Sequence, residues 1–143
     1  MTAIRPATFE DAPALVDLND QLGYPTTEAD MIERLTPILA SDEHAMLVAT
    51  DDGRPIAWIH VALEHGLEAS RVAVLRGLIV DERHRSMGIG HELLEAGEDW
   101  ARGRGCAAVI VRSRIAREGA HRFYRREGFE HVKTSHVFGK PLV

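Results

Sequence analysis

The sequence predicts an α/β fold, a single domain spanning 1–143 with a mixed, mostly antiparallel twisted sheet, one central parallel strand pair and about four flanking helices. Three observations predict it. The chain has 143 residues, 45% hydrophobic and 27% charged, which suits one globular domain with one core. Strand-like and helix-like apolar patterns follow one another in the order β-α-α-β-β-β-α-β-α-β-β. Short connections join the predicted antiparallel neighbours, and the helix between Arg71–Val80 and Ala107–Val111 provides the right-handed crossover that parallel strands require.

Four strands are predicted before residue 81. They are Thr2–Arg5, Ala45–Thr50, Ile56–Leu63 and Arg71–Val80. The segment Asp51-Asp52-Gly53-Arg54 is a hairpin turn of the Asp-Gly kind, so the strands on either side of it are antiparallel neighbours. Gly77 interrupts the fourth strand, and an isolated glycine there indicates a bulge or a close approach to the backbone.

Two helices are predicted between the first two strands. Thr8 is a suitable N-cap for the first, with acidic residues in the opening turn, and Gly23 ends its apolar stripe. The second is capped by Thr26 or Thr27. Pro37 lies inside its pattern and is expected to kink or split the helix, because proline lacks an N–H and its ring crowds the preceding turn.

The second half of the chain continues with helices and strands. A helix begins after Gly88 and is ended by Gly105. The next segment, Ala107–Val111, is a continuous apolar run, as expected of a parallel strand buried on both faces. The last predicted elements are a helix at Gly119–Arg126, with Gly128 just after it, and an antiparallel hairpin of Phe129–Val132 and Ser135–Phe138.

The loop between the fourth strand and the helix after it has the chemistry of an anion site. It contains Arg85-Ser86-Met87-Gly88-Ile89-Gly90, an R-x-x-G-x-G pattern at a helix N-terminus. Glycine lets ligand atoms approach the backbone, the first helical N–H groups have no intrahelical partner, and an arginine adds a charge-assisted contact. These features suit a phosphate or pyrophosphate, although a plain tight turn also uses two glycines. P-loop and dinucleotide motifs fit less well, because no Lys-Ser/Thr pair and no third glycine follow.

A second motif favours the anion site over the plain turn. Residues Ala120 to Phe129 have the pattern A-x-x-F-Y-x-x-x-G-F. With R-x-x-G-x-G at 85–90 and the order of elements, the sequence resembles the GNAT superfamily of acetyl-CoA-dependent N-acetyltransferases over nearly its whole length. The resemblance implies an enzyme that moves the acetyl group of acetyl-CoA to an amine of a small molecule or peptide, by direct attack in a ternary complex.

The resemblance also implies where acetyl-CoA binds. The loop 85–90 would hold the pyrophosphate, and residues 78–80 would pair their backbone with the pantetheine arm and polarise the thioester carbonyl. The implied cofactor contacts are Leu78, Ile79, Val80, Arg85, Ser86, Met87, Gly88, Ile89, Gly90, Arg117, Phe123 and Arg126. Which of Arg122, Arg125 and Arg126 meets the ribose phosphate stays open.

Tyr124 matches the tyrosine that protonates the departing thiolate in many members of the family. A phenol with a pKa near 10 stays protonated at neutral pH and can give its proton to a nascent thiolate. The alternative is a core aromatic whose hydroxyl is satisfied. Family members with a general base often carry a glutamate on the strand before the pyrophosphate loop, but residues 74–77 of this chain include no carboxylate. The general base is therefore not assigned, and the candidates are His60, Glu64 and His65.

Composition narrows the partners. The net charge of −5 argues against binding to nucleic acid, while the arginines gathered between residues 112 and 126 suit a small polyanionic ligand. The single cysteine, Cys106, excludes an internal disulfide, and the eight histidines lack metal-ligand spacings, so no metal is expected. With no apolar run of membrane-spanning length and no secretory signal, we expect a cytoplasmic protein without membrane contact.

The acceptor amine cannot be named from the sequence. Asp20, Tyr24 and Glu28 lie at the connection of the first two helices, a region that in GNAT members folds over the acceptor. Polyamine, amino acid, aminophosphonate, antibiotic and peptide N-terminus all stay open, and the resemblance suggests a homodimer. Two alternatives to catalysis are also open: an acyl-CoA-binding sensor domain and a protein-interaction module.

Overall fold

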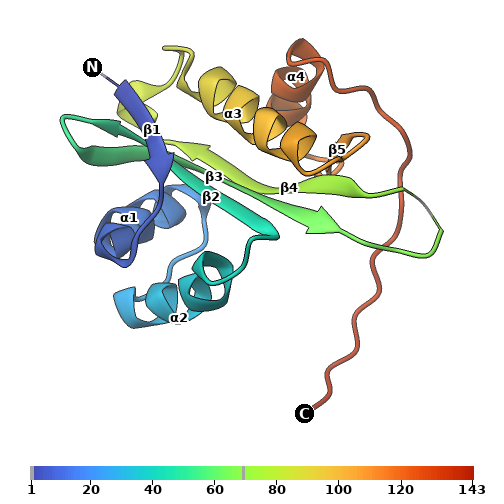
Figure 1. Cartoon of the computed structure of the whole chain (residues 1–143), viewed down its shortest axis with the longest axis horizontal. Helices are drawn as coiled ribbons and strands as arrows, with labels where there is room; N and C mark the ends of the chain where they lie inside the picture. The colour runs from blue at the N-terminus through green and yellow to red at the C-terminus, as the bar shows by residue number, and fades with distance from the viewer. Residues whose placement is uncertain (1, 69) are drawn as a thin grey trace. The chain divides into compact units, whose positions relative to one another are not determined.

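The computed structural model describes residues 2–68 and 70–143, which form two compact units, Met1–Arg112 and Ser113–Val143. The elements are β1 (Thr2–Pro6), η1 (Phe9–Asp11), α1 (Ala12–Leu22), α2 (Glu28–Leu39), β2 (His44–Asp51), β3 (Arg54–Glu64), β4 (Val72–Val80), η2 (Glu82–His84), α3 (Ile89–Gly103), β5 (Val109–Val111) and α4 (Glu118–Arg126) (Figure 1). All the strands and the helices α1 to α3 belong to the first unit, and α4 belongs to the second. That the whole chain is one domain stays a prediction.

The five strands form one sheet in the order β1-β2-β3-β4-β5. Neighbours are antiparallel except for β4 and β5, which are parallel and joined through α3. The predicted α/β fold with a mixed, mostly antiparallel sheet and four α-helices is therefore confirmed. The parallel pair lies at an edge of the sheet rather than at its centre, because the described residues form no strand beyond β5.

The turn between β2 and β3 is the predicted Asp-Gly hairpin. Asp52 has a φ of 50° and Gly53 a φ of 80°, so both central residues are in the left-handed region, as in a type I′ turn. The backbone twist of such a turn matches that of the strands it joins, and Asp51 pairs directly with Arg54.

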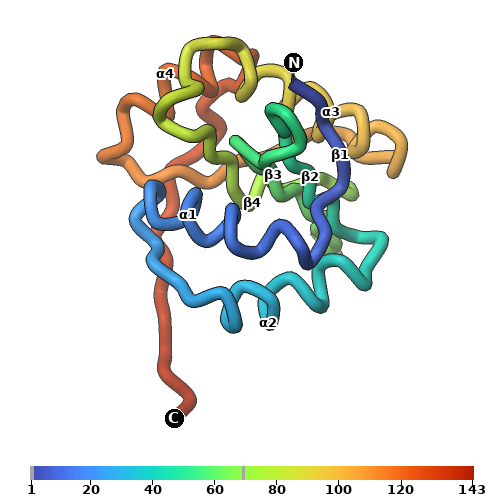
Figure 2. The backbone as a smooth tube through the Cα atoms, turned by 90° about the vertical axis from the view of Figure 1, so that its left-hand side faces the viewer, coloured from blue at the N-terminus to red at the C-terminus, as the bar shows by residue number. Residues whose placement is uncertain are grey.

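Helices cover both faces of the sheet in the first unit. Figure 2 shows α1 and α2 side by side along one face, where Leu15 and Leu35 pack with Met46 and Val48 of β2 in one buried cluster. The other face carries α3, whose Gly97 lies so close to Ile59 that an added Cβ would be 3.1 Å from its side chain. The sheet is thus a buried middle layer that holds the ends of its strands in fixed positions.

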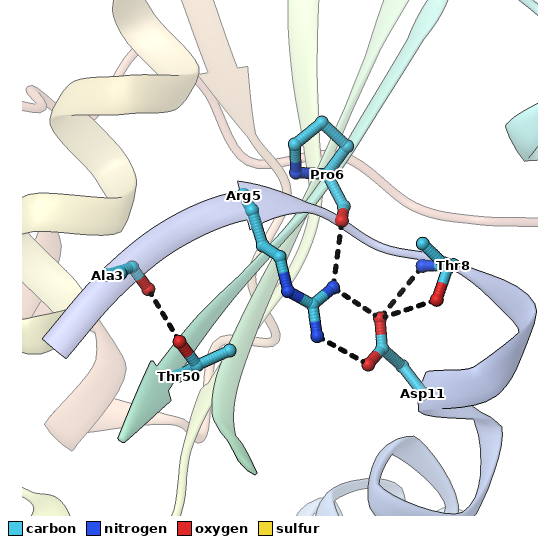
Figure 3. A network of polar contacts seen from close by, with 6 residues as sticks. All are labelled: Ala3, Arg5, Pro6, Thr8, Asp11 and Thr50. Carbon is cyan, nitrogen blue, oxygen red and sulfur yellow. Dashed lines mark hydrogen bonds and ion pairs between the residues drawn. The ribbon is translucent and has the colours of Figure 1, made fainter. Parts of the chain in front are cut away.

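An ion pair ties β1 to the start of the first helical segment (Figure 3). The Arg5 guanidinium donates to both oxygens of Asp11 at 2.8 Å, and the Thr8 backbone N–H donates to the same carboxylate at 2.8 Å. Asp11 is buried, and the hydrogen bond from Arg5 is the main reason that its pKa lies below the ordinary value. Thr8 is the N-cap of η1, which directly precedes α1, and the N-cap of α1 itself is Asp11.

The second helix also starts as predicted, but it is not split. Thr27 is its N-cap and accepts a hydrogen bond from the Asp30 N–H at 3.1 Å. The helix continues through Pro37 to Leu39. Pro37 lies in the last turn, where few hydrogen bonds follow it, so the missing N–H costs the helix little.

The interior glycine of β4 marks both a register shift and a close approach. The β3·β4 pairing shifts between His60 and Val61, opposite Arg76 and Gly77. A Cβ on Gly77 would lie 2.4 Å from the Trp58 indole, so only glycine leaves room for that ring.

Two predictions about the last third are wrong. First, β5 is shorter and more exposed than expected: it spans Val109–Val111, and Ile110 is 37% exposed. Second, residues 129–143, all of them described, contain no strand, so the hairpin of Phe129–Val132 and Ser135–Phe138 is not formed. A two-stranded hairpin is marginal without a sheet to join, and the connection at 133–134 has no Asn-Gly or Asp-Gly turn.

The helix of the second unit ends as predicted. Gly128 has a φ of 94°, its N–H donates to the Arg125 carbonyl at 3.1 Å, and the Phe129 N–H donates to the Tyr124 carbonyl at 2.9 Å. These two bonds make a Schellman motif, which glycine favours because it has no Cβ to strain in the left-handed region.

Candidate active site

The outer edge of β4 is only partly paired. β5 pairs with β4 at Ala73–Leu75 alone, so from Arg76 to Val80 that edge has no neighbouring strand among the described residues. The predicted pantetheine contacts Leu78, Ile79 and Val80 lie on this stretch. Backbone N–H and C=O groups on a free edge can pair with an extended ligand, as an added strand would.

The free edge leads directly into the glycine-bearing loop. Ser86 and Gly88 have φ values of 66° and 81°, and Gly88 is the N-cap of α3. Hydrogen bonds within the described part of the chain include none from the backbone N–H groups of Gly88, Ile89 and Gly90. These donors lie at the positive end of a helix of 15 residues, which favours an anion.

Some side chains of the loop 85–90 are exposed to solvent and others are buried. Arg85, Ser86 and Met87 are exposed, and Ile89 is buried under the helix start. The Arg85 Nε–H donates to the Val80 carbonyl at 3.3 Å, which holds its guanidinium beside the end of the free edge. A Cβ added to Gly88 would meet nothing within 4 Å, so the space above this backbone is open to a ligand.

Tyr124 lies in an aromatic group within the second unit. Its ring makes edge contacts with Phe123 and Phe129, at centroid distances of 5.5 and 5.6 Å. Desolvation raises the pKa of Tyr124, and the Arg117 charge opposes that effect in part. The hydrogen bonds among residues 2–68 and 70–143 include none to the Tyr124 hydroxyl.

The other predicted contacts of the second unit surround the same helix. Arg117 is the N-cap residue of α4, and the Arg126 guanidinium lies 5.6 Å from the centre of the Phe123 ring. Phe123 is therefore occupied by aromatic and cation–π packing, while both arginines stay exposed. None of these roles in cofactor binding is tested by the structure, and each stays a prediction.

Two of the three candidate bases are held in ion pairs. Arg112 donates to both oxygens of Glu64, at 3.0 and 3.3 Å, and this hydrogen bonding lowers the pKa of that carboxyl. His65 Nε2 lies 2.7 Å from the Glu43 carboxylate on the surface. Both residues make ordinary surface pairs, which weakens the case for either as the proton acceptor.

His60 is different because it lies across the ladder from Gly77, on the strand beside the free edge of β4. Its Nε2 is 2.9 Å from Nδ1 of His44 on β2, and the two rings stack. Burial lowers the pKa of His60 to about 4, and the charges of His44 and Arg76 act in the same direction. His60 is therefore neutral at pH 7, with the protonation state that a base requires.

Sequence reasoning missed Asp81, which lies between the free edge and the loop. The residue is 7% exposed, and its carboxylate accepts hydrogen bonds from Gln21 of α1 and His84 of η2, both at 2.9 Å. The only available signal was an acidic residue directly after an apolar strand, which is common in exposed loops. Its partner Gln21 is 60 positions away in sequence.

The described ranges 2–68 and 70–143 contain neither a metal-binding cluster nor a membrane-spanning helix. No group of three or more His, Cys, Asp or Glu side chains in them is arranged to hold a metal ion. No helix in the same ranges is both long and apolar enough to cross a lipid bilayer.

The Acetyltransferase (GNAT) family matches residues 12–129, most of the chain. The chain belongs to this family. An aminoglycoside N(6′)-acetyltransferase type 1 from Stenotrophomonas maltophilia is 35% identical over 144 residues, covering 97% of this chain and 93% of the relative. An aminoalkylphosphonate N-acetyltransferase from Salmonella typhimurium strain LT2 is 30% identical over 146 residues, covering 97% and 90%. The crystal structure of an aminoglycoside antibiotic 6′-N-acetyltransferase from Acinetobacter haemolyticus superposes with a TM-score of 0.86 at 24% identity, covering 99% of each chain.

This GNAT protein is an acetyl-CoA-dependent N-acetyltransferase, so the activity and the co-substrate that the resemblance implied are confirmed. The acyl-CoA sensor and the protein-interaction module receive no support from these similarities.

Proposed function

We propose that this GNAT enzyme transfers the acetyl group of acetyl-CoA to the 6′-amine of an aminoglycoside. The observation that carries the proposal is the 35% identity, over 97% of the chain, to an aminoglycoside N(6′)-acetyltransferase. The charge of the chain agrees with it, because a protein with a net charge of −5 attracts a polycationic acceptor.

In the proposed complex, acetyl-CoA lies along β4 and ends at the glycine loop. Pyrophosphate oxygens accept hydrogen bonds from the N–H groups of Gly88, Ile89 and Gly90, and Arg85 supplies a positive charge. The pantetheine amides pair with the free edge of β4 at Leu78–Val80. Support comes from the open space over Gly88 and from the edge of β4, which has no neighbouring strand at residues 76–80 among the described residues.

The acetyl group then passes directly to the amine in a ternary complex. The neutral amine nitrogen attacks the thioester carbonyl, and a backbone N–H of β4 stabilises the developing oxyanion. The nitrogen then loses its extra proton to solvent water as the C–S bond breaks. Tyr124 gives its proton to the departing thiolate. A raised pKa keeps this phenol protonated at neutral pH, and no hydrogen bond within the described chain competes for its hydroxyl. Cys106 takes no part as an acyl carrier, since direct transfer needs none.

The acceptor is proposed to bind at the connection between α1 and α2. This stretch, residues 23–27, follows Gly23, whose φ of 90° ends α1, and carries Tyr24, which is 54% exposed. Asp20 and Glu28 flank it and are exposed carboxylates that can pair with ammonium groups. Loops on a rigid scaffold commonly set the specificity of an enzyme.

The test compares two matched acceptors, neomycin and paromomycin, which carry an amine and a hydroxyl respectively at position 6′. Acetyl-CoA consumption should be rapid with neomycin and near background with paromomycin, and mass spectrometry with NMR should place the acetyl group on the 6′-nitrogen. A third assay uses 2-aminoethylphosphonate as the acceptor, because one relative is an aminoalkylphosphonate N-acetyltransferase. Equal rates with the two aminoglycosides, or turnover of the phosphonate alone, would refute the proposal.

We further propose that the enzyme is a homodimer assembled through its C-terminal segment. Five large apolar side chains there are at least 88% exposed: Val132, Val137, Phe138, Leu142 and Val143. Bare apolar side chains of this size mark an interaction surface. The outer edge of β5 also lacks a partner strand among the described residues, so a second copy offers the missing neighbour.

We place the enzyme in the cytoplasm. The support is its co-substrate, because acetyl-CoA is made and used inside cells. Fractionation of cells that express the full chain, followed by immunodetection, tests this, and recovery in a secreted fraction would contradict it.

A further inference from the structure

The Asp81 carboxylate is a buried charge at the start of the glycine loop. Its Oδ1 accepts from Gln21 Nε2 at 2.9 Å, its Oδ2 accepts from His84 Nδ1 at 2.9 Å, and Arg83 Nε lies 3.8 Å from Oδ2. The hydrogen bond from Gln21 is the main reason that the pKa of Asp81 is lowered. A buried carboxylate is costly unless its oxygens are hydrogen-bonded, so these partners fix the arrangement.

Gln21 uses both ends of its amide at this place. While Nε2 donates to Asp81, Oε1 accepts from the Glu82 backbone N–H at 2.9 Å. The Asp81 N–H in turn donates to the Ile56 carbonyl at 2.8 Å, which extends the β3·β4 ladder by one bond. The start of the loop is therefore attached to the sheet on one side and to α1 on the other. We call Gln21, Asp81 and His84 the clasp.

The clasp joins the two segments that the proposed function uses. Gln21 lies in the last turn of α1, directly before the proposed acceptor loop 23–27. Asp81 lies between the proposed pantetheine edge and Arg85 of the pyrophosphate loop. A carboxylate here repels phosphate, so Asp81 is not itself a cofactor contact, and its hydrogen bonds to both segments point to positioning.

We propose that the clasp couples the two substrate sites, so that acetyl-CoA bound at the glycine loop strengthens binding of the acceptor at residues 23–27. Gln21 and Asp81 are positioning residues in this mechanism. A cofactor that holds residues 81–90 in one arrangement also holds Gln21, and with it the end of α1. Such coupling typically changes affinity by about five- to a hundred-fold and is reciprocal between the two ligands. This inference rests on the proposed roles of the two loops.

The decisive variant is Gln21→Met. Methionine keeps the length of the side chain and removes both the donor and the acceptor, and because Gln21 is an exposed helical residue the fold should survive. Asp17→Asn is the matched control, since it alters an exposed polar residue of α1 that makes no hydrogen bond to residues 81–84 among those described. Asp81→Asn in a double-mutant cycle with Gln21→Met should show non-additive losses, because the two act through one bond.

Calorimetry gives the dissociation constant of neomycin with and without saturating CoA. In the wild type and in Asp17→Asn the ratio of the two constants should exceed about five, and in Gln21→Met it should fall to near one. In Gln21→Met the dissociation constant of CoA alone should change by less than about three-fold. A general loss of stability would weaken CoA binding as well, so it would not remove the coupling alone. A ratio near one in the wild type, or an unchanged ratio in Gln21→Met, would overturn the clasp.

Hydrogen exchange separates this failure from a failure of the proposed acceptor. CoA alone should slow exchange of the amides between residues 22 and 28 in the wild type and not in Gln21→Met. If neomycin does not bind but this difference in exchange is observed, the coupling role of the clasp is supported and the proposed aminoglycoside acceptor is refuted. If CoA slows exchange equally in both proteins, or does not bind the wild type, the coupling role is wrong.

Discussion

At the scale of single residues, a catalytic role for Tyr124 requires its hydroxyl group, whereas a packing role requires only its ring. Replacing it with phenylalanine keeps the ring that contacts Phe123 and Phe129, so the fold should survive. If the hydroxyl protonates the thiolate, kcat should fall by about a hundred- to ten-thousand-fold. The dissociation constant for acetyl-CoA should barely change, because the interaction forms mainly in the transition state. Single-turnover acetyl transfer and calorimetry measure the two quantities.

The other tyrosine is the control for this experiment. Tyr24→Phe removes a hydroxyl from the proposed acceptor loop, so it should alter KM for the acceptor. It should not change how the rate depends on the acidity of the thiol that leaves the thioester. Thioesters of more acidic thiols need the proton less and should recover much of the rate in Tyr124→Phe. A Tyr124→Phe enzyme with near wild-type rates on acetyl-CoA would assign Tyr124 to packing.

His60 gives a prediction about pH. Its pKa is about 4 in the folded protein and 6.5 in a free side chain, so between these values the unfolded chain binds a proton that the folded protein does not. Stability therefore rises with pH across this window and falls on acidification, by up to roughly 3 kcal/mol from this group. Urea titrations at pH 4.5 and 7 should show a smaller loss in His60→Gln than in the wild type. Equal losses would mean that His60 already binds its proton in the folded state.

At the scale of elements, the glycine loop can be separated from ordinary turns. Gly88 and Gly53 both have positive φ values, 81° and 80°, and an added Cβ would meet nothing at either position. Valine should therefore strain both backbones by a similar amount, about 1–2 kcal/mol. Only Gly88→Val should weaken CoA binding, because its side chain fills the space over the helix N-terminus. Calorimetry on both folded variants decides, and equal CoA affinities would make residues 85–90 a plain turn.

The same scale shows which elements can be predicted from sequence. The Asp52-Gly53 turn, the Thr27 cap and the glycine ends of α1, α3 and α4 were predictable, because each depends on the local backbone preference of one or two residues. The C-terminal hairpin was not, because apolar residues show that a segment can form a strand but do not specify whether it pairs with a sheet edge. Pro37 was predicted to kink or split α2 because proline disfavours helix interiors, but it lies in the last turn, where it does not end the helix.

At the scale of the whole molecule, the motifs predict the glycine loop and Tyr124 as parts of the site, but they predict none of the contacts between distant segments. The clasp joins Gln21 to Asp81, and the histidine pair joins His44 to His60 across two strands. Neither pair has a sequence signature, because exposed glutamines and isolated histidines are common. Such contacts depend on the register of the sheet and on the packing of α1, which single-sequence patterns do not specify.

The C-terminal segment carries the last prediction. Full-length chains of 15.9 kDa should elute as a species of about twice that mass in size-exclusion chromatography with light scattering, since the apolar side chains of residues 132–142 are too exposed for a stable lone chain. Removing residues 131–143 should give a monomer, and the full-length variant Val137→Lys with Phe138→Lys should do the same by placing two charges in the interface. The paired substitution controls for loss of chain length. A full-length monomer at micromolar concentration would mean that this segment finds its partner strand within its own chain, whereas a dimer that survives both changes would place the interface on another surface.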